Sequence, residues 1–174
     1  MSAISYTTAP PAAAEPATSA GDSTGAPAQQ ASQDSERPLV MQIIIDRSLT
    51  KAPEWSRGAL IAQGAHAAIA IMTETAGEAA TQAYVAPAQL GSMHKVVLQS
   101  PKTGTLAELS KKLDEAYKAA SGDGATHEVL GMSFPRHHLW VEQPEGIPTA
   151  IAIAPNRKPL ALTDILKKCT LFRD

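Results

Sequence analysis

The sequence is poor in cysteine, in aromatic residues and in long apolar runs, and each shortage excludes a class of protein. Its single cysteine, Cys169, cannot form an internal disulfide, so the 174-residue chain is not a disulfide-stabilised scaffold. No apolar run reaches the roughly 18 residues that a membrane-spanning helix needs. Aromatic residues make up 4% of the chain and hydrophobic residues 44%, which together predict one domain with a mainly aliphatic core.

Basic residues are missing from the first 36 positions, where Ala, Ser, Thr and Pro dominate. Such a composition buries too little surface to offset the entropy of ordering, so residues 1–36 are predicted to be a disordered tail before a domain at 37–174. The tail also lacks the basic start and apolar centre of a secretory signal and the arginines of a mitochondrial presequence. We therefore expect a cytoplasmic protein.

Without its tail the chain is slightly basic. All 15 Lys and Arg lie in residues 37–174, together with 13 of the 17 acidic residues, so the predicted domain has a formal net charge of +2 whereas the whole chain has −2. This balance is compatible with a local basic patch, but it is too small to indicate nucleic-acid binding by itself.

The hydrophobic periods in the domain predict an α/β fold. Strands are predicted at residues 39–45, 95–100, 137–143 and 149–154. Helices are predicted at 58–77, more weakly at 78–90 with a break at Pro87, at 105–120, and after Pro155 ahead of a hydrophobic tail. The last two strands are antiparallel if paired, because their connection is too short for a parallel crossover. This order predicts a mixed four-stranded sheet covered by helices, with a long surface loop at 121–136.

Two of the helices carry specific signals. Thr105 and Glu108 have the spacing of a capping box, and Gly122 and Gly124 close the same helix. The helix at 58–77 has a stripe of small and apolar residues suited to close packing on a sheet: Leu60, Gly64, Ala67 and Ile71.

Gln63 and His66 interrupt that apolar helix. They are three positions apart and therefore look out of roughly the same side. Taken alone, His66 reads as a hydrogen-bonded packing histidine, and Gln63 can equally tie down a loop carbonyl.

Four segments in a fixed order resemble a known family. "ALIAQGAHAA" is followed by "MHKVVL", "LWVEQPEGIPTAIAIAP" and "LKKCTLF". Together they resemble the type II (archaeal/eukaryotic) peptidyl-tRNA hydrolase family, in particular its divergent eukaryotic branch, over about residues 38–173. The resemblance implies a three-layer α/β/α sandwich on a mixed four-stranded sheet. It also implies hydrolysis of the ester between a peptide and the terminal ribose of tRNA, with the tRNA acceptor arm as partner and without a metal or organic cofactor.

Carried over position by position, the resemblance implies a set of site residues. Gln63 and His66 fall on the family's Gln and His, and Glu142 stands where the family has its catalytic Asp. Arg57 and Lys95 fall on or near basic positions, which makes them candidates for substrate binding. Glu142 and His66 are expected to meet at one rim of the sheet if the first and third strands are parallel neighbours.

The match departs from the family pattern at three places. The motif lysine falls on Ala59, and the segment after Glu142 is about five residues shorter, with no clear counterpart of the family's threonine. The R-x-D-L at the end of the first strand becomes residues 46–49, "DRSL", so that its aspartate is lost as well. Ester hydrolysis needs an activated water and stabilisation of an oxyanion, and these departures touch both.

Other patterns in the sequence have structural explanations or do not support a catalytic or metal site. Glu142 can instead pair with Arg136 or Lys95 at the sheet edge. His137 and His138 are adjacent in a strand and point to opposite faces, so we predict no metal site there. No base lies at a suggestive spacing from Ser56, Ser92 or Cys169, which argues against a nucleophilic triad.

The sequence is therefore compatible with three functions. The first is a metal-independent hydrolase that acts on peptidyl-tRNA or aminoacyl-tRNA. The second is a catalytically impaired pseudoenzyme that binds RNA or a protein partner, and the loss of the lysine at Ala59 favours it. A third is an adaptor that recognises ubiquitin-like or signalling partners through the Ala-rich helix.

Overall fold

The computed structural model describes residues 37–121 and 133–173. The predicted tail at 1–36, Gly122, Gly124 and most of the predicted loop at 121–136 lie outside the described residues. None of the helices in the two described ranges is long and apolar enough to cross a membrane.

The sheet has five strands in the order β3-β4-β1-β2-β5. Their bounds are β1 Val40–Ile45, β2 His94–Gln99, β3 His137–Glu142, β4 Ile147–Asn156 and β5 Thr170–Leu171. β1 and β2 are parallel, and the other neighbouring pairs are antiparallel, including β3 with β4 as predicted. The sheet is therefore mixed.

The prediction of four strands is wrong because the hydrophobic tail after the last helix adds a fifth, β5, along β2. The backbone N–H of Phe172 donates to the carbonyl of Val97 at 3.0 Å. β5 is only two residues long, and both of its residues are exposed. A strand this short has no alternation from which it can be predicted.

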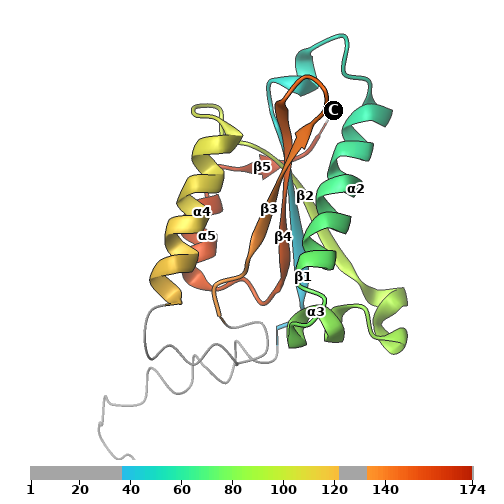
Figure 1. Cartoon of the computed structure of the whole chain (residues 1–174), viewed down its shortest axis with the longest axis vertical. Coiled ribbons are helices and arrows are strands. Elements are labelled where there is room, and N and C mark those ends of the chain that lie inside the picture. The colour runs from blue at the N-terminus through green and yellow to red at the C-terminus, as the bar shows by residue number, and fades with distance from the viewer. Residues whose placement is uncertain (1–36, 122–132, 174) are drawn as a thin grey trace, which may run out of the picture.

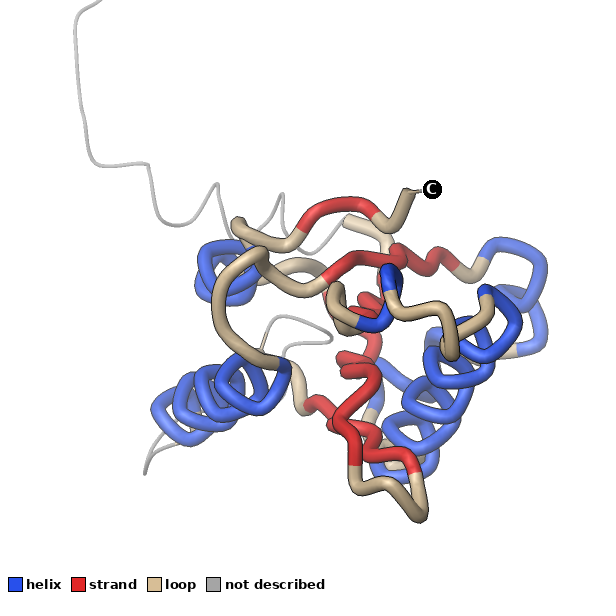
Figure 2. Tube along the Cα trace, turned by 90° about the horizontal axis from the view of Figure 1, so that it is seen from above, coloured by secondary structure: helices blue, strands red, loops and turns tan. Residues whose placement is uncertain are grey.

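The helices lie on both sides of this sheet. They are α2 Arg57–Glu74, α3 Ala79–Tyr84, α4 Leu106–Ala120 and α5 Leu160–Leu166, with 3₁₀ turns at η1 Leu49–Lys51 and η2 Pro87–Ser92. The four predicted helices are confirmed, and Pro87 begins η2 where the break was expected. Figures 1 and 2 show α2 and α3 on one side of the strands and α4 and α5 on the other.

Alternating residues of the central strands fill two separate cores. On one face, Met41, Ile43 and Ile45 of β1 pack with α2 and with the alanines of β4. On the other face, Ile44 packs with the leucines of α4 and α5. Because helices cover both of its faces, every residue of β1 is buried, which is why this strand reads as a nearly unbroken apolar run.

α2 sits close to β1 because it has a glycine at the contact. A Cβ built on Gly64 would come within 3.2 Å of Ile43 Cγ2 and 3.3 Å of Ile45 Cδ1. Leu60, Gly64 and Ala67 are all buried, as the small-residue stripe predicted. The capping box of α4 is confirmed too, since Glu108 Oε2 accepts from the backbone N–H of Thr105 at 2.9 Å.

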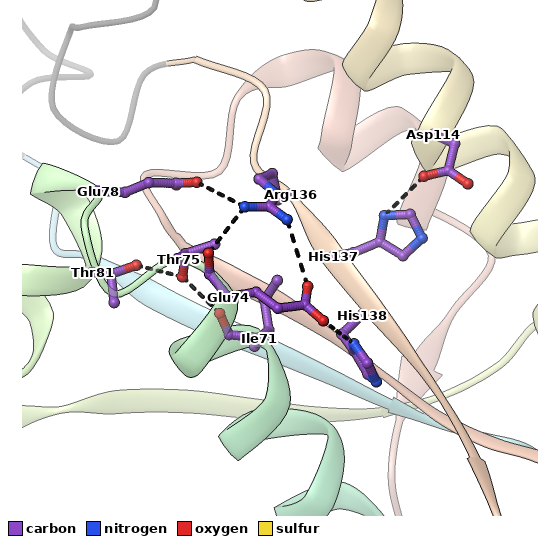
Figure 3. A network of polar contacts seen from close by, with 9 residues as sticks. All are labelled: Ile71, Glu74, Thr75, Glu78, Thr81, Asp114, Arg136, His137 and His138. Carbon is purple, nitrogen blue, oxygen red and sulfur yellow. Dashed lines mark hydrogen bonds and ion pairs between the residues drawn. The ribbon is translucent and has the colours of Figure 1, made fainter.

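A network of polar contacts joins the end of α2 to the start of β3, as Figure 3 shows. Arg136 donates to the carbonyl of Glu74 at 3.0 Å and forms ion pairs of 3.7 Å with the carboxylates of Glu74 and Glu78. His138 Nδ1 lies 2.6 Å from Glu74 Oε1. Arg136 therefore pairs at this end of the sheet, rather than with Glu142 as the sequence had left open.

His137 and His138 point to opposite faces of the sheet, as expected for neighbours in a strand (Figure 3). His138 faces α2, whereas His137 faces α4, where its Nε2 lies 2.7 Å from Ser110 Oγ and its Nδ1 lies 3.9 Å from Asp114. Burial lowers the pKa of His137, and the carboxylate of Asp114 only partly opposes that effect. His137 is thus a packing residue on the α4 side.

Candidate functional site

Two of the predicted catalytic residues meet on one tryptophan. His66 of α2 stacks on the indole of Trp140 in β3, with ring centroids 4.8 Å apart and planes inclined by 19°. The same indole donates from Nε1 to Glu142 Oε2 at 3.0 Å. Trp140 and Glu142 are two positions apart in a strand and so lie on the same face of the sheet. The structure therefore brings His66 and Glu142 together through Trp140.

The strand arrangement that produces this meeting differs from the expected one. β1 and β3 are parallel but not neighbours, because β4 lies between them and is antiparallel to both. α2 crosses over β4 and reaches β3, so the helix rather than strand pairing brings His66 to Trp140.

Gln63 lies beneath α2, not beside His66 at the surface. Its side chain is buried with 4% exposed, and its Oε1 accepts a hydrogen bond of 2.8 Å from the hydroxyl of Thr149 in β4. Thr149 is fully buried, and its carbonyl accepts from the backbone N–H of Asp46 at the end of β1. Gln63 thus ties α2 to the sheet directly under the site, by way of a hydroxyl and not the loop carbonyl considered from sequence.

We expect Thr149→Val to lower the free energy of unfolding by about 1–3 kcal/mol, because the buried amide oxygen of Gln63 loses its donor. Urea denaturation measures this change. The double variant Gln63→Leu with Thr149→Val is the control, and its cost should be less than the sum of the two single changes, since neither polar group is then left alone. Additive costs would contradict a direct bond.

Sequence reasoning missed Thr149 and Trp140. In the sequence, Thr149 is only the first residue of a predicted apolar strand, yet a lone polar residue in a buried strand needs a buried hydrogen-bond partner. Trp140 is one of two tryptophans in a chain poor in aromatic residues, and it lies two positions before Glu142. That spacing was the available signal, because it puts the two side chains on one face.

The two predicted substrate-binding cations lie away from the tryptophan. Arg57 and His66 are nine positions apart on α2. Nine residues make about two and a half helical turns, so the two side chains project from opposite sides of the helix. Lys95 lies beside the C-terminal half of α2 in a depression that Met72 also lines, with its Nζ 5.3 Å from the centre of the Tyr84 ring. The structure therefore separates Arg57 and Lys95 from each other and from Trp140.

Arg57 lines a cleft of about 810 Å³ at the end of the sheet where α2 begins. We call it the basic cleft, because four of its lining residues are cationic and no described residue lining it is acidic: Arg47, Lys51, Arg57 and Arg173 are the cations. It lies next to β5, the strand that was not predicted.

The hydroxyl and thiol groups considered as nucleophiles are either engaged in local hydrogen bonds or held in an unreactive state. Ser56 is the N-cap of α2 and accepts from the backbone N–H of Ala59 at 3.2 Å. Ser92 donates to Gln89 within η2. Burial raises the pKa of the Cys169 thiol to about 11, against the opposing charge of Arg47, so that this thiol stays protonated at neutral pH and is a poor nucleophile.

Within residues 37–121 and 133–173, no three His, Cys, Asp or Glu side chains are grouped so that they could hold a metal ion. The site at Trp140 is instead built from one imidazole, one carboxylate and the indole between them.

Comparison with known proteins identifies the family of the chain. Residues 39–172 match the family described as "Peptidyl-tRNA hydrolase PTH2". A human protein named "Putative peptidyl-tRNA hydrolase PTRHD1" is 37% identical over 136 residues, which cover 78% of this chain and 83% of that protein. The mouse protein of the same name is 36% identical over 136 residues, which again cover 78% of this chain and 83% of that protein. The chain therefore belongs to the PTH2 family of peptidyl-tRNA hydrolases.

Proposed function

We propose that this protein is a peptidyl-tRNA hydrolase that cleaves the ester between the peptide and the terminal ribose of tRNA. The observation that carries the proposal is the contact of both His66 and Glu142 with Trp140, in a chain of this family. The substrate class comes from the family, and the candidate catalytic groups come from the site.

The reaction needs one water and two proton transfers. The water oxygen bonds to the ester carbonyl carbon while a general base takes one of its protons. The tetrahedral intermediate then collapses, the bond to the ribose oxygen breaks, and that oxygen takes a proton as tRNA leaves. We assign these transfers to Glu142 and His66. The bond from Trp140 occupies one oxygen of Glu142, and a carboxylate has two.

The rest of the machinery is proposed on the same basis. Gln63 supports the site through Thr149, and Arg57 and Lys95 are proposed to contact phosphates of the tRNA acceptor arm. We further propose that the two helical layers and the sheet form the three-layer sandwich of the family, that the enzyme needs no cofactor, and that it works in the cytoplasm.

A catalytically impaired protein that binds RNA is the second candidate, and one observation favours it. Ala59, which replaces the family's lysine, is seven positions from His66 on α2 and therefore lies on nearly the same side, two turns nearer the start of the helix. The missing ammonium thus belonged to the side of α2 that carries His66. Its loss removes a cation from the substrate's surroundings.

Release of free tRNA from a labelled peptidyl-tRNA by the purified protein tests the proposed function, with a type II enzyme as positive control. We expect measurable turnover, and we expect Ala59→Lys to raise it, because the variant returns a cation to the side of α2 that carries His66. No turnover by the natural chain and none by Ala59→Lys would reject the hydrolase and favour the RNA-binding alternative.

A further inference from the structure

The basic cleft lies on the side of α2 that faces away from Trp140. We propose that it binds single-stranded RNA, and that its occupant is the unpaired 3′ segment of tRNA. The identity of the RNA as tRNA rests on the proposed function, whereas the charge and shape of the cleft do not.

The charge of the cleft is the first support. The domain from residue 37 onward has a formal net charge of only +2, yet four cations line this one cleft. Among the described residues, Asp46 and Glu54 directly adjoin lining residues in sequence, but neither lines the cleft. Asp46 uses its Oδ1 to accept from both the backbone N–H and the hydroxyl of Ser48. Four cations without an acidic residue among the described lining residues attract a polyanion, and a nucleic acid backbone is the polyanion that they fit.

The wall of the cleft is held in place by Arg47. Its Nε donates to the carbonyl of Ser100 at 2.9 Å, and its Nη2 donates to the hydroxyl of Thr170 at 2.6 Å. These bonds join the end of β2 to β5, and β5 carries Phe172 and Arg173 into the cleft. Arg47 is therefore a positioning residue as well as a source of positive charge.

Aromatic side chains distinguish single-stranded RNA from a simple anion or a duplex. Trp55 and Phe172 line the cleft among the cations, and both are only partly buried. Unpaired bases stack on such rings, whereas the bases of a duplex are already stacked on one another. Cations for the backbone combined with rings for the bases are the common design of a single-strand site.

The distance to Trp140 also favours an extended ligand. Arg57 and His66 lie on opposite sides of a helix about 10–12 Å wide, and nine residues of helix rise about 14 Å. A ligand in the cleft that also reaches His66 has to pass around the N-terminal half of α2. An unpaired polynucleotide can do so, and a compact anion cannot.

Fluorescence anisotropy of the full chain tests this proposal, with a labelled single-stranded RNA ending in CCA and a blunt duplex of the same sequence as probes. We expect the single strand to bind more tightly than the duplex. In the double variant Lys51→Ala with Arg173→Ala, both of which are exposed positions, we expect affinity to fall about tenfold or more at low salt. The slope of log K against log salt should also fall by about 1.4, which corresponds to two phosphates on a single strand.

Two further variants separate the contributions. Lys111→Ala with Lys112→Ala removes the same charge from the exposed side of α4, on the other face of the sheet, and should leave affinity nearly unchanged. Phe172→Leu should weaken binding about fivefold or more without changing the salt slope, because stacking releases no counterions.

The outcomes are separable from those of the hydrolase assay, because these probes carry no peptidyl ester for the enzyme to cleave. The proposal would be overturned if the cleft double variant and the α4 double variant lost affinity equally. It would also be overturned if duplex and single strand bound equally well and Phe172→Leu had no effect. The absence of RNA binding by a natural chain that still hydrolyses peptidyl-tRNA would overturn it as well. If the natural chain binds RNA with the expected pattern but shows no turnover, the proposed hydrolase function is rejected and the proposed RNA site in the basic cleft is supported.

Discussion

Replacing His66 by Ala, or Glu142 by Gln, should lower the turnover of peptidyl-tRNA by about a hundredfold or more in each case. Each change removes one proton-transfer group, and such groups contribute about 10²–10⁴ in rate. Glu142→Gln is a close test, because its amide oxygen can still accept from Trp140 Nε1 while it can no longer take a proton. Steady-state measurement of kcat and KM reports the loss, which should fall mainly on kcat.

Stability and a neighbouring acid provide the controls. His66 is exposed and Glu142 only half-buried, so the unfolding midpoint of both variants should stay close to that of the natural chain. Glu145→Gln removes a negative charge from the exposed turn just after β3 and should leave kcat unchanged. Full turnover in His66→Ala or Glu142→Gln would remove that residue from the mechanism.

Trp140→Leu should lower kcat by about tenfold or more, although the side chain takes no part in proton transfer. The indole holds both proposed catalytic groups, one by stacking and one by a hydrogen bond. Without it, each group gains freedom to leave the reactive arrangement, and lost positioning is lost rate. We expect Trp140→Phe to lie between Trp140→Leu and the natural chain, since a phenyl ring can still stack under His66 but cannot donate to Glu142.

The ranking of these variants is the test of Trp140 as a positioning residue. Loss of core packing alone would lower the unfolding midpoint in parallel with activity, so both quantities are measured for each variant. If Trp140→Phe has the activity of Trp140→Leu, then the hydrogen bond to Glu142 dominates. If both variants keep full activity at unchanged stability, Trp140 does not position the catalytic groups.

Much of the fold follows from local patterns in the sequence. The apolar run at 39–45, the small-residue stripe of α2 and the capping box of α4 each determined an element, because hydrophobic period and end-capping act over a few neighbouring residues. The alternation of strand residues likewise determined that His137 and His138 face opposite sides. His66 and Glu142 are identified as site residues by the resemblance of their surrounding motifs to the family, because hydrophobic periodicity says nothing about their role.

How these elements meet depends on contacts between residues far apart in the sequence. Gln63 and Thr149 are 86 positions apart, and Arg47 and Thr170 are 123 apart, so no local pattern couples either pair. β5 forms because β2 offers an open edge, and a two-residue segment has no period that announces it. The position of Trp140 between His66 and Glu142 likewise depends on how α2 crosses the sheet, and the four cations of the basic cleft depend also on the pairing of β5 with β2. These contacts depend on the packing of distant elements, whereas a sequence pattern records only what each element needs for itself.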